Sequence, residues 1–194
     1  MRNYRALLLT VTAGLLLSLS SCFLPEDFEV TISVKQDGSY TFQYDGNLVF
    51  VMALSAKKEG KLTKEDEKSL KEQEKKLLES PGFKKAKYIG NARYKVLVEQ
   101  SGKPGVDYYF ISKEMSIFSI KGQSDGSVEI KALQMSAKDL EGLKSVNVTI
   151  AGTLSVLLDK GVKVIEHNAD KASPGLYQWR IKNPEKAPFI IIKP

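Results

Sequence analysis

The sequence contains one cysteine and one histidine among its 194 residues, and these shortages exclude several kinds of site. A single cysteine forms no intrachain disulfide. A single histidine supplies neither a multi-histidine metal centre nor most histidine-based proton relays within one chain. The Gly-x-Ser-x-Gly pattern of a serine nucleophile is also missing. We therefore expect a protein that is not an enzyme and that holds no metal ion or other cofactor.

The charge and the composition exclude two further classes of protein. The chain has 29 basic and 23 acidic side chains, a net charge of +6, and 42% of its residues are hydrophobic. This apolar fraction is typical of a folded domain and excludes disorder of the whole chain. Residues 1–21 hold two of the basic side chains and no acidic one, so the rest of the chain carries +4. Such a weak positive charge gives no reason to expect nucleic acid as a partner.

Residues 1–21 have the pattern of a secretory signal peptide. Arg2 and Arg5 form a short positive segment, and residues 6–19 are apolar and uncharged. This apolar stretch is shorter than a typical membrane span. The only cysteine of the chain, Cys22, follows the segment directly.

The end of this segment, Leu19-Ser20-Ser21-Cys22, resembles the lipobox of bacterial lipoproteins. The resemblance implies cleavage between Ser21 and Cys22, a diacylglycerol group on the Cys22 sulfur and often a further acyl chain, such as palmitate, on the new amine. Two or three acyl chains on one residue make attachment to a membrane stable. The alternative is an uncleaved signal anchor that ends in a cysteine by chance.

The residue after Cys22 is Phe23 rather than an aspartate. In Gram-negative lipoproteins, sorting by this second residue implies that the protein leaves the inner membrane. We therefore expect a lipid-anchored protein of the cell envelope, on the periplasmic face of the outer membrane if the cell has one. The membrane is its first partner, through acylated Cys22, and the oligomeric state is left open.

The folded part is expected to begin close to the anchor. Residues 22–27 predict a short acylated tether, and residues 28–194 predict a single domain. Residues 28–35 alternate between apolar and polar side chains, which is the pattern of a β-strand with one buried face. The body of the protein is thus expected to lie near the membrane surface.

The remaining pattern is mostly that of strands and turns. A hairpin is predicted by the alternation in 40–44, which follows the turn-forming residues 36–39. Residues 48–56 are apolar and fit either a buried strand or the start of a helix. Further strands are predicted at 87–89, 92–98, 107–112, 115–121, 128–132, 146–150, 154–158, 162–165, 176–181 and 188–192.

Residues 63–79 predict one long charged helix. Thr63 and Asp66 have the spacing of a capping box at its start. A narrow apolar stripe is formed by Leu62, Leu70 and Leu77. We expect this stripe to rest on a sheet, and the alternative is a helix face that docks a partner.

These elements predict an α+β fold: one domain with a large, mostly antiparallel β-sheet, one long charged helix and one short helix. The short helix is expected from Ser136, which can cap it, to Leu143. No repeating strand–helix–strand period is present, so a doubly wound parallel sheet is not expected.

A run of basic and aromatic residues is the candidate surface for contact with a membrane or an anion. Its cations are Lys84, Lys85, Lys87, Arg93 and Lys95. Anionic headgroups attract such residues, and a lipid anchor would keep those headgroups close. The alternative is the exposed face of two strands whose aromatic residues point inward.

Three other features have structural interpretations. His167 lies among acidic residues, and we expect a surface residue in a turn rather than a general base. Asp37 and Asp125, each followed by glycine, predict hairpin turns, because a calcium loop needs more oxygen ligands at fixed spacing. Trp179 is expected in the core rather than in a ligand pocket.

Short segments of the body, 34–39, 168–170 and 179–181, resemble uncharacterised bacterial envelope lipoproteins with an LppM-like domain. The resemblance implies an α+β fold and a role in handling envelope lipids. It brings no catalytic residues to this sequence.

Three functions are compatible with these observations. The first is a non-enzymatic, lipid-anchored envelope protein that binds a lipid, another apolar ligand or an envelope partner. The second is a structural accessory that docks another envelope protein through the charged helix 63–79. The third and least favoured is a hydrolase with an unrecognised site. An apolar cavity between helix and sheet would favour the ligand-binding protein. An exposed apolar stripe on the helix would favour the structural accessory. Carboxylates around His167 in a cleft would favour the hydrolase.

Overall fold

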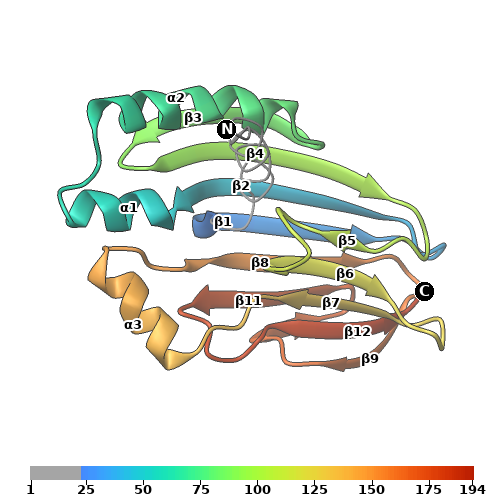
Figure 1. The fold of residues 1–194 in the computed structure, drawn as a ribbon. Coiled ribbons are helices and arrows are strands. Elements are labelled where there is room, and N and C mark those ends of the chain that lie inside the picture. The colour runs from blue at the N-terminus through green and yellow to red at the C-terminus, as the bar shows by residue number, and fades with distance from the viewer. Residues whose placement is uncertain (1–22) are drawn as a thin grey trace, which may run out of the picture.

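The computed structural model describes residues 23–194, which form twelve strands and three helices (Figure 1). The predicted signal peptide, its cleavage site between Ser21 and Cys22, and the acylation site Cys22 lie outside the described residues. The α+β fold predicted from the sequence is confirmed.

The strands form two sheets rather than the one that the sequence predicts. The larger sheet has the order β10-β11-β8-β1-β2-β4-β3, and all its neighbours are antiparallel except β1 and β8. Its strands are β10 (Lys171–Ser173), β11 (Leu176–Lys182), β8 (Ala151–Leu158), β1 (Phe23–Val34), β2 (Tyr40–Phe50), β4 (Arg93–Gly102) and β3 (Phe83–Gly90). The smaller, antiparallel sheet contains β5 (Tyr108–Tyr109), β6 (Phe118–Gly122), β7 (Val128–Ala132), β12 (Phe189–Lys193) and β9 (Lys163–His167).

Aromatic side chains from both sheets meet in one core. Phe28 on β1 stacks on Tyr44 of β2, with ring centroids 6.0 Å apart, and meets Phe118 of β6 edge-on at 5.5 Å. Phe110, which follows β5, stacks on Tyr44 at 4.7 Å. These residues are buried because alternate side chains of each strand point to the same face.

The strand β1 begins at Phe23, so residues 23–27 are not the tether that the sequence predicts. Phe23 and Leu24 are buried and pair with Phe50 and Val49 of β2. The second neighbour of β1, strand β8, pairs only from Phe28 onward. Pro25 therefore lies in a segment with one neighbouring strand, β2, and proline is tolerated at such edge positions.

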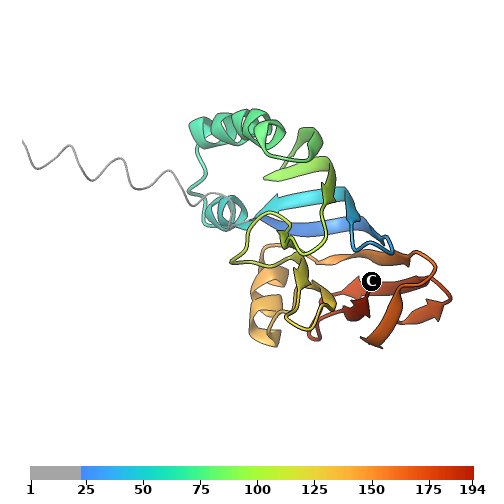
Figure 2. The same cartoon turned by 90° about the vertical axis from the view of Figure 1, so that its right-hand side faces the viewer.

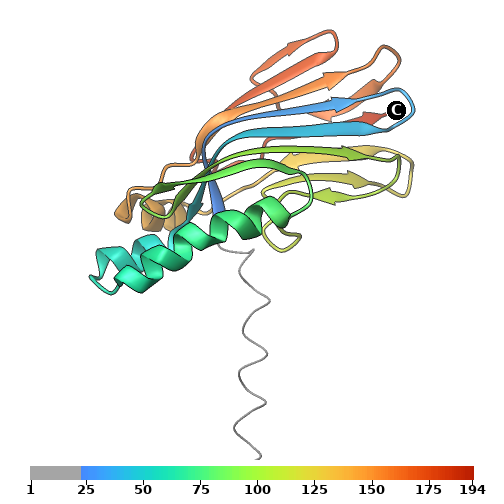
Figure 3. The same ribbon diagram turned by 90° about the horizontal axis from the view of Figure 1, so that it is seen from above.

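The ambiguous segment 48–56 is both a strand and a helix. Strand β2 ends at Phe50, and helix α1 (Val51–Lys58) follows without a loop. It is a third helix that the sequence does not predict. In Figure 3, α1 and α2 lie along one flank of the strands.

The predicted long helix is confirmed as α2 (Lys64–Glu79), with Thr63 as its N-cap and the expected capping box to Asp66. Leu70 and Leu77 are buried against the larger sheet, and Leu62 is half-buried. The Tyr94 hydroxyl donates to the Leu70 carbonyl at 2.6 Å. The predicted short helix is α3 (Ala137–Ser145), capped by Ser136.

Polar contacts also fasten α2 to the edge strand β3. The Tyr88 hydroxyl donates to a Glu67 carboxylate oxygen at 2.6 Å, and the Tyr88 backbone N–H donates to Glu74 at 2.8 Å. These bonds, together with the two buried leucines, make α2 a packed part of the body.

Truncation of Leu70 tests how far the packing of α2 stabilises the protein. We expect Leu70→Ala to lower the free energy of unfolding by about 2–3 kcal/mol, the low end for a buried leucine. The neighbouring exposed variant Lys71→Ala should change it by less than about 0.5 kcal/mol. Denaturant melts of residues 23–194 measure both changes. An unchanged midpoint for Leu70→Ala would contradict the structural role and favour a docking role for this face.

Candidate functional site: an apolar groove beside the start of β1

Two hollows meet at Phe23, the first residue that the structure describes. The first hollow lies between α1 and α2 and has a volume of about 380 Å³. The second lies between the end of α2, β4 and the segment 108–111, and has a volume of about 480 Å³. Phe23, Gln73 and Lys76 line both hollows, so we treat the two as one groove, the α2 groove.

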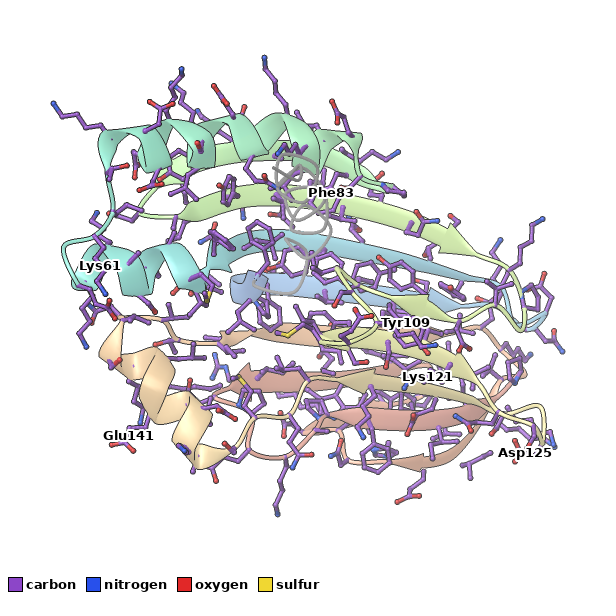
Figure 4. All side chains as sticks on the ribbon, in the orientation of Figure 1. Lys61, Phe83, Tyr109, Lys121, Asp125 and Glu141 are labelled. Carbon is purple, nitrogen blue, oxygen red and sulfur yellow. The ribbon has the colours of Figure 1, made fainter. Side chains whose placement is uncertain are left out.

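The walls of the α2 groove come from segments far apart in the sequence. Figure 2 shows α2 and the segment between β4 and β6 on the same side of the larger sheet. Phe83 and Tyr109, both labelled in Figure 4, line the second hollow from β3 and β5. The floor is closed by Phe23, whose ring lies 5.4 Å from that of Phe50 and 5.6 Å from that of Tyr94.

The first hollow is mostly apolar. Its apolar lining consists of Phe23, Phe50, Met52, Ala53, Ala56, Leu62 and Leu70, and its polar lining consists of Asp66, Ser69, Gln73 and Lys76. An apolar hollow of this volume with a few polar groups is typical of sites for apolar small molecules. Met52, which belongs to this lining, is 63% exposed. This is the largest exposed fraction among the exposed large hydrophobic residues described.

The ionisable groups of the groove have simple states near neutral pH. The hydroxyl and the backbone N–H of Thr63 donate to the Asp66 carboxylate, and these hydrogen bonds hold the pKa of Asp66 below its ordinary value. Burial raises the pKa of Tyr108, which therefore keeps its proton. The groove thus offers one anion and one cation, Asp66 and Lys76, and otherwise neutral groups.

The five cations predicted to contact a membrane or an anion do not form one cluster. Arg93 forms a bidentate pair with Glu26, with nitrogen–oxygen distances of 2.6 and 3.1 Å, and Lys95 pairs with Asp45 at 2.6 Å. Arg93 is engaged because Glu26 belongs to β1 and not to a tether. Among residues 23–194, these two cations already have carboxylate partners.

The other three cations, Lys84, Lys85 and Lys87, are exposed on β3. Ala86 is buried and Tyr88 bonds to α2, so the side chains of Lys85 and Lys87 point to the opposite face of the sheet. They therefore lie on the face of the sheet that is turned away from the α2 groove.

His167 is exposed, as predicted, but it is the last residue of strand β9 and not a turn residue. The side chain is exposed, its Nδ1 accepts a hydrogen bond from the Ala169 N–H at 3.1 Å, and its ring meets Tyr177 edge-on at 4.9 Å. Within residues 23–194, no three histidine, cysteine or acidic side chains are grouped closely enough to hold a metal ion.

The hairpin turns at Asp37 and Asp125 are confirmed. Each carboxylate accepts hydrogen bonds from the backbone N–H and the hydroxyl of a serine two residues later, Ser39 or Ser127. These bonds hold the pKa of both aspartates below the ordinary value. The carboxylates therefore stabilise the turns.

Trp179 belongs to the core, as predicted. It is buried, and its indole N–H donates to the Asn168 side-chain oxygen at 2.8 Å. The same oxygen accepts from the Phe189 backbone N–H at 2.8 Å, so it joins β11 of the larger sheet to β12 of the smaller one.

The chain matches no protein-family model and no curated protein. Among solved structures, it resembles the NMR structure of the folded domain of LppM from Mycobacterium tuberculosis. The two are 11% identical, the alignment covers 88% of each chain, and the TM-score is 0.36. The LppM-like resemblance predicted from the sequence is therefore present only as a weak structural likeness, which assigns no function. Within residues 23–194, no helix is long and apolar enough to span a bilayer.

Proposed function

We propose that the protein is a non-enzymatic lipoprotein of the cell envelope that is anchored through acylated Cys22 and binds the apolar part of a lipid in the α2 groove. The observation that carries the proposal is the position of the groove: its floor is Phe23, the residue next to the proposed anchor. Each methylene group removed from water contributes about 0.8 kcal/mol, so an acyl chain gains affinity along its whole length. Because Phe23 and not an aspartate follows Cys22, we also propose that the protein lies on the periplasmic face of the outer membrane if the cell has one.

The two other functions have less support. Docking of a partner through α2 needs an exposed apolar stripe on this helix. Leu70 and Leu77 of α2 are buried, however. The third large apolar side chain of the helix, Leu78, is 44% exposed. Hydrolysis needs a reactive group in a cleft, and His167 is exposed beside Tyr177. The apolar groove favours ligand binding.

Substitution of the proposed anchor tests the first half of this function. We expect Cys22→Ser to release the protein from membranes or to leave it uncleaved, because serine cannot form the thioether. Membrane fractionation and the intact mass of the mature protein measure the result. An unmodified Cys22 in mature wild-type protein would contradict the proposed anchor.

Filling the groove tests the second half. Ser69 lines the first hollow, and Ser69→Trp should place an indole ring where an acyl chain would lie. We expect the dissociation constant of a fluorescent long-chain fatty acid to rise at least about tenfold, which corresponds to about 1.4 kcal/mol.

The control for this variant is Lys71→Trp on the same helix. Lys71 is exposed and is not part of the lining of either hollow, so its tryptophan should leave the dissociation constant within about twofold. Equal binding by both variants and the wild type, or no binding by any of them, would refute the groove as a lipid site. Native mass spectrometry of the protein taken from membranes identifies a lipid that purifies with it.

A further inference from the structure

We infer that the body docks on the bilayer through one particular face, formed by α1, the opening of the α2 groove and the segment 108–116, with Met52 in the apolar layer. We call this the docking face. The inference rests on the proposed anchor at Cys22. It goes beyond that proposal because an anchor alone would leave the orientation of the body free.

The first argument is the absence of spare chain between the proposed anchor and the fold. Phe23 is 3% exposed and is held between the rings of Phe50 and Tyr94. Consecutive Cα atoms are about 3.8 Å apart, so an acylated residue 22 lies within one residue of the groove. The part of the body that surrounds Phe23 must therefore lie at the membrane surface.

The second argument is the chemistry of that part of the body. Met52, exposed over 63% of its surface, lies in the first turn of α1, and the half-buried Phe50 and Val51 precede it. An exposed apolar side chain is ordinarily unfavourable in water, whereas the flexible methionine side chain adapts well to an irregular apolar environment. Burial of Met52 among acyl chains therefore gives this exposed residue a favourable contact.

The other border of the docking face is the segment between β5 and β6. Ile111 lines the second hollow and has a φ of 70°, a left-handed conformation that is unfavourable for a β-branched residue. Met115 in the same segment is half-buried. Such strained positions persist where the surrounding structure holds them, and they occur often at ligand contacts.

The docking face carries more cations than anions near α1 and the groove, although Asp66 also lines the first hollow. Lys76 lines both hollows, and α1 ends in Lys57 and Lys58 without any acidic residue in the helix. Anionic headgroups attract such ammonium groups. By contrast, the membrane contact that the sequence predicts for Lys85 and Lys87 requires the opposite face of the sheet to meet the bilayer. The two orientations exclude each other.

The experiment uses full-length protein with single labels. Acylation leaves no free thiol, so Met52→Cys introduces one cysteine that a bimane fluorophore can modify. The purified lipoprotein is reconstituted into vesicles of phosphatidylethanolamine and phosphatidylglycerol that contain nitroxide-labelled acyl chains. We expect the label at position 52 to be quenched at least about twofold by the nitroxide lipids and to be shielded from iodide in the water.

Matched controls come from other faces. Ile165 on β9 is 56% exposed, close to the value for Met52, and Lys87 lies on the outer face of the larger sheet. Labels introduced by Ile165→Cys and Lys87→Cys should be quenched by iodide and not by the nitroxide lipids. Quenching of the label at 87 by lipid, or equal iodide quenching at 52 and 165, would overturn the inference.

The intact mass of the same samples separates this inference from the proposed function. An acylated Cys22 with a water-exposed label at 52 would refute the docking face and leave the anchor in place. An unmodified Cys22 would refute the anchor and the docking face together.

Discussion

Replacement of Gly152 by alanine is expected to destabilise the protein by at least about 3 kcal/mol, at the upper end of the cost of overpacking a core. A Cβ atom at this position would lie 2.3 Å from the backbone oxygen of Phe28 and 2.5 Å from its ring. Because one of these neighbours is backbone, the clash cannot be relieved by a side-chain rotation alone. The strand pair β1–β8 must separate, or the ring of Phe28 must leave the core.

The sensitivity of this position follows from the surroundings of Phe28. Phe28 pairs with Gly152 on one side, and on the other side a β-bulge places it beside Gly46, where a Cβ would lie 2.6 Å from the Phe28 Cβ. Phe28 thus fills the space that two glycines leave on the neighbouring strands. Its ring then reaches Tyr44 and Phe118, which joins the two sheets.

The matched control for Gly152→Ala is Gly142→Ala. Gly142 lies in helix α3 with no atom within 4 Å of the added Cβ, so alanine should stabilise the protein by about 0.5–1 kcal/mol. Thermal melts should show a loss of at least about 6 °C for the first variant and a small gain for the second. A neutral Gly152→Ala would refute the close packing of Phe28 between β2 and β8.

Removal of the Arg93 guanidinium is expected to cost about 3 kcal/mol, the low end for breaking a buried ion pair because the Arg93 side chain is still 21% exposed. Arg93 holds the Glu26 carboxylate by two nitrogens and donates to the Asn147 carbonyl at 2.9 Å. This pairing raises the pKa of Arg93. In Arg93→Met, the Glu26 carboxylate loses its counterion, and Glu26 is only 8% exposed in the wild-type structure.

Two comparisons isolate this effect from the loss of a surface charge. Lys95→Met removes a cation two residues further along β4. Lys95 pairs with Asp45, but both side chains are about half exposed. The free energy of unfolding should therefore fall by less than about 1 kcal/mol. The double variant Glu26→Leu/Arg93→Met should lose less than the sum of the single variants, since neither charge is then left alone. Denaturant melts measure five proteins: the wild type, Glu26→Leu, Arg93→Met, the double variant and Lys95→Met. Strict additivity in the Glu26–Arg93 cycle would refute the pairing.

Local patterns in the sequence predicted the local structure well. The charged helix with its Thr63 cap, the short helix at Ser136 and the turns at Asp37 and Asp125 depend on residues close in sequence, and all are confirmed. The parallel pairing of β1 with β8 and the division into two sheets depend on contacts between distant segments. Alternation of apolar residues shows that a strand has a buried face, but it does not show which strand lies beside it.

The groove was not predicted because no local pattern encodes it. Its lining comes mainly from β1 to β4, α1, α2 and the segment 108–111, and each contributes only a few residues. Phe23 and Leu24 were the available signal, since two large apolar residues directly after the proposed anchor suit a core better than a tether. The ion pair between Arg93 and Glu26 was not predicted either, because it forms only if Glu26 belongs to strand β1.

The position of β1 in the middle of the larger sheet also determines the order in which the molecule can fold. The first strand of the body pairs on one side with its hairpin partner β2, but its other neighbour, β8, lies near the end of the chain (Figure 1). Contacts between segments so far apart in sequence form slowly, because a long loop must close before they contribute any stability. A chain that emerges from the ribosome N-terminus first therefore has to wait for β8 before β1 has a neighbouring strand on both sides.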